Sequence, residues 1–346
     1  MTTHFESGSA SRRRWLASLC ASAVAVLWRP CSARAQTKST KKPTAAEPKL
    51  EELPPETLDV LAEIRRLAKR AGLKELSTTI TPPFVAVGDA PESFRKEALR
   101  ICRDLSRVYA SFFKGRGFEV AVPETTSLVV MTLGSIESFQ KYAAAQEGIK
   151  VAPGGLLAGF YSVGKNMLVM FDFRADRKNL GANSERANTF SLVHEEMHQL
   201  CYNTGLLDRA REIPVAVSEG LGTFAEVWDP FRRGVALGAI NKQRLNVLRP
   251  LNGGMPEWIP MERLFSTDEL FYKEETEQEA YAEAWLFTHL MLRDHRNAEK
   301  FRGYLDLLHA PRNMPNRIED ATLHFGDLRK LDIELKRYRD RLALKR

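Results

Sequence analysis

The chain has 346 residues, of which 44% are hydrophobic and 27% are charged, a composition typical of a folded globular protein. The formal net charge is +7, but residues 1–35 contribute five arginines and one glutamate to it. Without them the 51 basic and 44 acidic side chains become 46 and 43, a net charge of about +3. This small excess gives no reason to expect binding to nucleic acid or to an anionic membrane.

The first 35 residues have the three parts of an export signal. The stretch "SRRRWLA" (11–17) resembles the twin-arginine translocation motif, with Arg12 and Arg13 as the pair. An apolar run over 16–28 follows, shorter than the roughly 20 residues of a membrane span, and "ARA" (33–35) offers a cleavage site. We therefore predict a signal peptide over 1–35, a periplasmic or secreted location, and no stable membrane insertion after cleavage. An uncleaved amphipathic anchor is the alternative.

The mature chain begins with a polar segment and continues with an α/β pattern. Residues 36–54 are rich in Pro, Lys and Glu, which predicts a disordered linker. An α/β lobe is expected over 55–205. Apolar spacing and a Ser135 cap predict its helices at 55–71, 91–113 and 135–146. Strands are expected at 77–88, 127–133, 156–163 and 167–173, the last two forming a hairpin.

Beyond Gly205, an expected helix C-cap, the pattern becomes helical throughout. Helices are predicted at 214–229, 237–248, 277–293, 296–309 and 327–344, and no strand is expected. The fold class is therefore α+β, with an all-helical lobe over 206–346. Cys102 and Cys201 lie among apolar helical residues, so we expect two buried free thiols, with a disulfide as the alternative.

The stretch "SLVHEEMHQLCYNTG" (191–205), on a helix expected to start near Ser184, contains the most specific chemical signal in the chain. His194 and His198 are four residues apart, so on a helix they share one face, about 40° apart, and can chelate one ion. Glu195 flanks that face, whereas Glu196 lies on the back. Two imidazoles and a neighbouring carboxylate are what a hydrolytic zinc ion requires. A surface helix with two exposed histidines is the alternative, and the apolar neighbours argue against it.

The next segment, "IPVAVSEGLGTFAEVW" (213–228), is an apolar helix with two acids, Glu219 and Glu226. They are seven residues apart and hence on one face, and an acid in such a helix needs a partner. One can be the third metal ligand, and the other can accept the ring N–H of a ligand histidine. Ion pairs with nearby arginines are the alternative. Gly220 and Gly222 weaken the helix, which makes sense if another helix must approach closely.

An H-E-x-x-H motif followed by a helix with "SEGLGTF" resembles the gluzincin zinc metallopeptidases. The resemblance implies a zincin-like fold with a mixed sheet, one Zn²⁺ per chain, and Glu195 as general base. His194, His198 and Glu219 match the zinc ligands, and Glu226 takes the supporting role. The segments "GFYS", "HEEMHQLCYNTG", "VSEGLGTFAE" and "YAEAWLFTHLML" are similar to a group of secreted bacterial gluzincin-like proteins.

The resemblance also suggests how a substrate would be held. "LLAGFYS" (156–162) occupies the place of an antiparallel edge strand, to which a peptide can add through main-chain hydrogen bonds. An ordinary internal hairpin is the alternative. Tyr281 is the first candidate for stabilising the transition state, followed by His289, Tyr161 and Tyr202. Core packing is the alternative for each of them.

These features predict a zinc-dependent hydrolase that acts on a peptide or protein. In this interpretation Glu195 takes a proton from the attacking water and gives it to the leaving amine. A non-catalytic module that binds peptide or cell-wall polymer around a structural zinc ion is the alternative, although it would not need Glu195. Hydrolysis of another amide, such as one in peptidoglycan, would use the same mechanism.

Overall fold

The computed structural model describes residues 49–73, 75–146, 159–176, 184–231, 236–249, 257–310 and 316–344. The predicted signal peptide and residues 36–48 of the predicted linker lie outside them. Within the remaining linker range, Leu50–Glu52 form a one-turn 3₁₀ helix, η2, and Leu53 is buried. Across the described ranges, no helix is both long enough and apolar enough to span a membrane.

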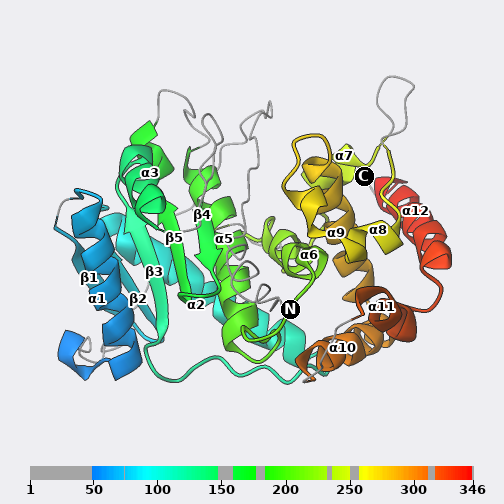
Figure 1. The fold of residues 1–346 in the computed structure, drawn as a ribbon, viewed down its shortest axis with the longest axis horizontal. Coiled ribbons are helices and arrows are strands. Elements are labelled where there is room, and N and C mark those ends of the chain that lie inside the picture. Colours follow the sequence, from blue (N-terminus) through cyan, green and yellow to red (C-terminus); the bar gives the residue numbers. More distant parts are fainter. Residues whose placement is uncertain are drawn as a thin grey trace, which may run out of the picture.

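A five-stranded mixed sheet forms the centre of the N-terminal half (Figure 1). Its strand order is β1-β2-β3-β5-β4, with β2, β3 and β5 parallel and the two edge strands antiparallel to their neighbours. The strands are β1 Ser77–Thr81, β2 Phe84–Gly88, β3 Leu128–Leu133, β4 Gly159–Ser162 and β5 Met167–Phe171. The hairpin expected from the sequence is β4–β5, and β4 lies at the edge as an antiparallel strand. Residues 156–158 of the expected edge segment lie outside the described residues.

The single strand expected over 77–88 is instead a pair of antiparallel strands. Thr81 pairs with Phe84, so Pro82 and Pro83 form the connection between β1 and β2. Proline has no N–H to donate to a strand ladder and its φ angle is fixed, which explains why the strand is interrupted there. The Thr- and Val-rich composition indicated the extended backbone correctly, but the two prolines decide the topology.

Helices cover both faces of the sheet and give three layers (Figure 1). These helices are α1 Pro55–Arg70, α2 Glu92–Lys114, α3 Ile136–Ala145 and α5 Ser184–Asn203. Alternate residues of β2 separate the layers, because Val85 and Val87 pack with α1 and α3, whereas Phe84 and Ala86 pack with α2 and α5. Ser135 caps α3 as predicted, since its hydroxyl accepts a hydrogen bond from the Ser138 N–H at 3.1 Å.

The C-terminal half is helical, and no strand occurs after α5 in the part of the chain that the structure describes. Its helices are α6 Val215–Ala225, α7 Lys242–Val247, α8 Met261–Ser266, α9 Glu277–Met291, α10 His295–His309, α11 Arg317–Phe325 and α12 Leu328–Leu344. The helix expected over 237–248 is shorter because Asn241 caps it and starts it at Lys242. The short helices α8 and α11 were not predicted.

One continuous apolar core joins the two halves. It runs from α2 and the inner face of the sheet through α5 and α6 to α12. Helices α6 and α9 approach closely at Gly220, where a Cβ atom would collide with Thr288 Oγ1 and lie 2.8 Å from the Ala284 carbonyl oxygen. This close contact fixes α6 against α9, while the other side of α6 packs on α5.

Three smaller predictions about this core are confirmed. Cys102 and Cys201 are buried free thiols. Helix α5 begins at Ser184, where the sequence predicted its start. Gly205 follows its C-terminus with a φ of 88°, a left-handed conformation that glycine adopts easily.

Candidate metal centre

Helix α5 is attached to the sheet by polar side chains as well as by its apolar residues. Near its start, the Asn188 side chain accepts the Phe173 N–H at 2.8 Å and donates to Asp172 Oδ1 at 2.9 Å. Further along, Gln199 Nε2 donates to the Val129 carbonyl oxygen on β3 at 3.0 Å. These bonds fix the rotation of the helix about its axis. The face that carries the histidines is thereby directed at α6.

His194, His198 and Glu219 converge and form a group that could hold a metal ion. His194 Nε2 lies 3.1 Å from His198 Nε2 and 3.2 Å from Glu219 Oε2, and the third distance, His198 Nε2 to Glu219 Oε2, is 3.6 Å. Ligand atoms about 2.1 Å from a tetrahedrally coordinated ion lie about 3.4 Å from each other. The three atoms therefore already have the spacing of three corners of a tetrahedral site.

Gly222 leaves the space into which these ligand atoms point. A Cβ atom at this position would lie 2.7 Å from His194 Nε2 and 2.9 Å from His198 Nε2, closer than real Cβ contacts. Glu219 precedes it by three residues on α6, so the carboxylate and the space share one face of the helix. The close approach of α9 explains Gly220, whereas Gly222 leaves room for the ring nitrogens of His194 and His198.

Glu226 supports His194 from the side opposite the ligand group. Glu226 Oε1 lies 3.1 Å from His194 Nδ1, so the ring can present Nε2 to an ion while its other nitrogen is held. Arg244 donates to both oxygens of Glu226, at 2.6 Å and 3.1 Å, and Asn241 Nδ2 donates at 2.7 Å. Both carboxylate oxygens of Glu226 are thus engaged by this network.

The carboxylates of Glu219 and Glu226 are both held in their charged form. Burial alone would raise the pKa of Glu226, but the Arg244 guanidinium and His194 outweigh it and lower the pKa to about 2. Burial acts in the same way on Glu219, and His198 and His194 outweigh it, so its pKa lies well below the usual range. The charged carboxylate is the form in which a glutamate binds a metal.

Glu195 has a different environment from the other two acids. Its side chain is buried beside the histidines, and Oε2 has no hydrogen-bond partner within the described ranges. Burial raises its pKa, and the two histidines and the Tyr161 main-chain N–H oppose this only in part. A Cβ atom on Gly159 of β4 would lie 3.4 Å from Glu195 Cγ, so this glutamate lies directly against the edge strand. Glu195 therefore stands between the ligand group and β4.

Tyr281, the first sequence candidate for the transition state, is buried on α9 behind Glu226. Its ring contacts Phe271, with centroids 5.3 Å apart, and the Arg244 guanidinium carbon lies 5.1 Å from the ring centroid. The structure thus connects Tyr281 to the ligand group through Arg244 and Glu226. His289, the second candidate, is hydrogen-bonded through Nδ1 to the Tyr338 hydroxyl at 2.7 Å, inside the helical half.

The remaining two candidates lie next to each other at the edge strand. The Tyr161 hydroxyl donates to Asn166 Oδ1 at 2.6 Å and is used structurally. Tyr202 stacks on it with centroids 5.9 Å apart and an interplanar angle of 20°. The Tyr202 hydroxyl has no hydrogen-bond partner among the residues that the structure describes. Because Tyr202 is one turn after His198, its side chain leans toward that ligand.

Asn241 and Arg244 were not among the site residues predicted from the sequence. The asparagine carried a recognisable signal, since Asn before a short helix is a common N-cap. No local pattern, however, connects Arg244 with an acid eighteen residues earlier. Their meeting depends on how α7 packs against the rest of the helical half.

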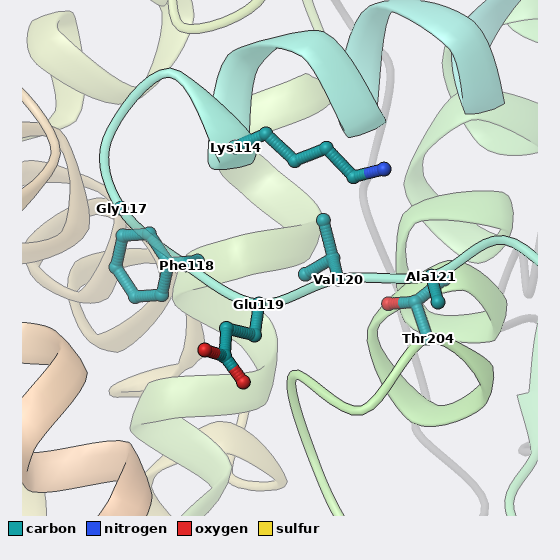
Figure 2. A pocket seen from close by; sticks show the side chains of 7 residues that line it. All are labelled: Lys114, Gly117, Phe118, Glu119, Val120, Ala121 and Thr204. Atoms are coloured by element: carbon teal, nitrogen blue, oxygen red, sulfur yellow. The ribbon is translucent and has the colours of Figure 1, made fainter.

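A surface cavity of about 480 Å³ opens where α2 and α5 end (Figure 2). Figure 2 shows the Lys114 and Glu119 side chains pointing in different directions at its rim. Its lining residues are Lys114, Gly117, Phe118, Glu119, Val120, Ala121 and Thr204. It contains none of the metal-ligand group, so we assign it no part in the chemistry of the site.

The comparisons with known proteins bear on this region. A family model described as "Protein of unknown function (DUF1570)" matches residues 188–310, about a third of the chain. The matched range includes the ligand group together with Glu226 and Arg244. No match was found among the curated proteins.

Proposed function

We propose that the chain is a zinc-dependent hydrolase of peptide bonds, with His194, His198 and Glu219 as the zinc ligands. Two imidazoles and one carboxylate favour zinc over the oxygen-seeking ions Ca²⁺ and Mg²⁺. The resemblance of the two motif segments to gluzincins supports the same assignment. Hydrolysis, as distinct from metal binding, depends on Glu195.

The proposal rests on the buried side chain of Glu195, whose Oε2 has no hydrogen-bond partner within the described ranges. A buried carboxylate oxygen without a hydrogen-bond partner costs free energy, and a purely structural metal site has no use for one. A hydrolytic site does need such a group beside the ion, able to accept a proton. Burial raises the pKa of Glu195, which makes it a stronger base than an exposed glutamate.

A bound zinc ion would supply Lewis acidity and lower the pKa of water at the site. Glu195 would accept a proton from the attacking water and then donate it to the leaving amine. Glu226 would keep His194 in the orientation and tautomer that present Nε2 to the ion, because it holds Nδ1 at 3.1 Å.

The substrate side of the site is the edge strand β4. Within the described sheet β4 pairs only with β5, and we propose that an extended peptide adds to its other edge through main-chain hydrogen bonds. A peptide held there would pass Glu195, which lies against Gly159. Tyr202 joins Tyr281 as a candidate donor to the developing oxyanion, because the Tyr202 hydroxyl has no hydrogen-bond partner among the described residues and its side chain leans toward His198.

A second function, metal binding without hydrolysis, is favoured by one observation. The ligand side chains are almost fully enclosed, with 2% of His194, 2% of His198 and 1% of Glu219 exposed. Structural metal sites are closed in this manner, whereas catalytic sites keep one position open. In this alternative the scaffold would bind a peptide or a cell-wall polymer.

Adjacent glutamates allow a matched test. Glu195→Gln and Glu196→Gln make the same chemical change at two buried positions of α5, and Glu196 lies on the side of Cys102, away from the ligands. We expect both variants to bind one zinc ion per chain, measured by elemental analysis. Only Glu195→Gln should lose cleavage of a mixed peptide library, by about 10²–10⁴-fold. Equal activity of both variants, or stoichiometric zinc without cleavage by the native protein, would contradict the hydrolase.

The proposed location follows from residues 1–35. We propose export by the twin-arginine route to the periplasm or the medium, so that substrates are encountered outside the cytoplasm. That route carries folded proteins, which would let the chain take up its metal before export.

A further inference from the structure

We propose that Asn241 and Arg244 are positioning residues of the metal centre, and that the short helix α7 which carries them controls the affinity for the ion. They act through Glu226, which in turn orients His194. The proposal rests on the metal centre proposed above and concerns residues outside the ligand group.

The contacts form a chain that ends at a ligand. Arg244 Nη2 lies 2.6 Å from Glu226 Oε1, and the same oxygen lies 3.1 Å from His194 Nδ1. Arg244 Nε and Asn241 Nδ2 reach the other oxygen, Oε2, at 3.1 Å and 2.7 Å. Since one oxygen serves both Arg244 and His194, any movement of the guanidinium moves the acceptor of the histidine ring.

Asn241 has two functions that can be separated. Its Oδ1 accepts the N–H groups of Gln243 and Arg244 at 3.2 Å and 3.3 Å, and so caps the first turn of α7. Its Nδ2 binds Glu226 at the same time. Because one side chain both caps α7 and binds Glu226, it fixes the start of the helix relative to the carboxylate. The cap therefore also places Arg244 within hydrogen-bonding distance of Glu226.

The network is enclosed, which makes its geometry important. Exposure is 3% for Glu226, 4% for Arg244 and 0% for Asn241, and Tyr281 covers the guanidinium at 5.1 Å. A buried ion pair recovers its desolvation cost only when its hydrogen bonds are well formed. No water can replace a lost donor here as easily as at the surface.

The two ligand histidines differ in the hydrogen bonds made by their Nδ1 atoms. Within the described ranges, His198 Nδ1 has no hydrogen-bond acceptor, so the outer hydrogen bonds of the ligand pair are concentrated on His194. Loss of such an outer partner typically weakens metal affinity about 10–100-fold. By linkage, an ion that binds better when α7 is in place must also hold α7 in place.

The test uses Co²⁺ alone as the probe, titrated into the metal-free full chain and followed by its absorption spectrum and by chelator competition. Arg244→Met removes the guanidinium, and Arg244→Lys keeps the charge without the two-point contact. Asn241→Asp keeps a good N-cap for α7 but replaces the donor to Glu226 by a like charge. Arg317→Met is the matched control, because Arg317 also forms ion pairs in the helical half, with Asp268 and Glu212.

We expect Co²⁺ affinity to fall about 10–100-fold in Arg244→Met and in Asn241→Asp, less in Arg244→Lys, and to stay within about threefold in Arg317→Met. In the native protein, Co²⁺ should slow amide hydrogen exchange of residues 242–247, and this protection should be lost in Asn241→Asp. Circular dichroism of each metal-free variant checks the fold.

Two outcomes would overturn the proposal, and they differ in what else they affect. Unchanged Co²⁺ affinity in both folded variants, Asn241→Asp and Arg244→Lys, would mean that the network only attaches α7 to the core. A native protein that binds no Co²⁺ would overturn this proposal together with the metal centre. A native protein that binds Co²⁺ but cleaves no peptide would refute the proposed hydrolase function only. The Co²⁺ affinities of the variants would then still decide whether Asn241 and Arg244 are positioning residues.

Discussion

Replacing Gly222 by alanine should separate metal binding from folding. The new Cβ atom would lie 2.7 Å from His194 Nε2 and 2.9 Å from His198 Nε2. An ordinary van der Waals contact for a Cβ atom begins near 3.4 Å. At least one ring must therefore move by about 0.5–0.7 Å, which is more than the roughly 0.2 Å tolerance of metal–ligand distances.

Two opposing effects determine the stability of the metal-free variant. Alanine favours a helix over glycine by about 1 kcal/mol, and the extra methyl group in a packed site costs about 1–3 kcal/mol. We expect the free energy of unfolding to fall by at most about 2 kcal/mol. Zinc affinity should fall about 100-fold or more, because the change acts on the ligands themselves rather than on an outer partner.

Gly220→Ala is the matched control, two residues earlier on the same helix. Its Cβ atom would meet Thr288 and the Ala284 main chain on α9, so it should lower stability without entering the space between the histidines. Denaturant unfolding of the metal-free proteins measures stability, and competition with a zinc chelator measures affinity. Native zinc affinity in a folded Gly222→Ala variant would show that the ion does not bind between these rings.

Three further predictions concern the base, the pH dependence and export. Glu195→Gln should keep the metal and lose activity, whereas His194→Ala should lose both, which metal analysis and a peptide-cleavage assay distinguish. The pKa of Glu226 is lowered to about 2, so its stabilisation of the metal-free fold is complete above about pH 4.5 and is lost as the pH falls toward 2. Glu226→Gln should therefore flatten this part of the measured dependence of the unfolding free energy on pH. Changing Arg12 and Arg13 to lysine should trap precursor in the cytoplasm, and normal export of that variant, followed by cell fractionation, would argue against the twin-arginine route.

The parts of the site that were predictable from sequence depend on helical spacing. The four-residue spacing of His194 and His198 places both on one face of any helix, whatever surrounds it. The apolar character of the segment around Glu219 likewise required a partner for a buried acid. The β4–β5 hairpin follows from two apolar runs around a Gly-Lys-Asn turn, because strand and turn preferences are also local.

The parts that were not predictable depend on tertiary packing. Periodicity can place Tyr281 on α9, but it cannot say that Arg244 of another helix will cover its ring. The same limit applies to Arg244 and Glu226, since the fold alone brings α7 to the end of α6. Pro82 and Pro83 did indicate the break between β1 and β2. The prediction of one strand over 77–88 gave more weight to the strand-forming residues around them.

The three glutamates around the ligand group show how environment assigns different roles to one residue type. All three are buried, so desolvation acts to raise each pKa. Glu226 has the Arg244 guanidinium to offset that effect and Glu219 has two imidazoles, so both stay charged and can serve as support and as ligand. Glu195 lies against the edge strand, where the same histidines offset burial only in part. Separated pKa values of this kind are how neighbouring carboxyl groups take on different parts of acid–base chemistry. A proton can therefore be held at Glu195 while Glu219 and Glu226 remain anionic, and this combination is what the proposed hydrolysis requires.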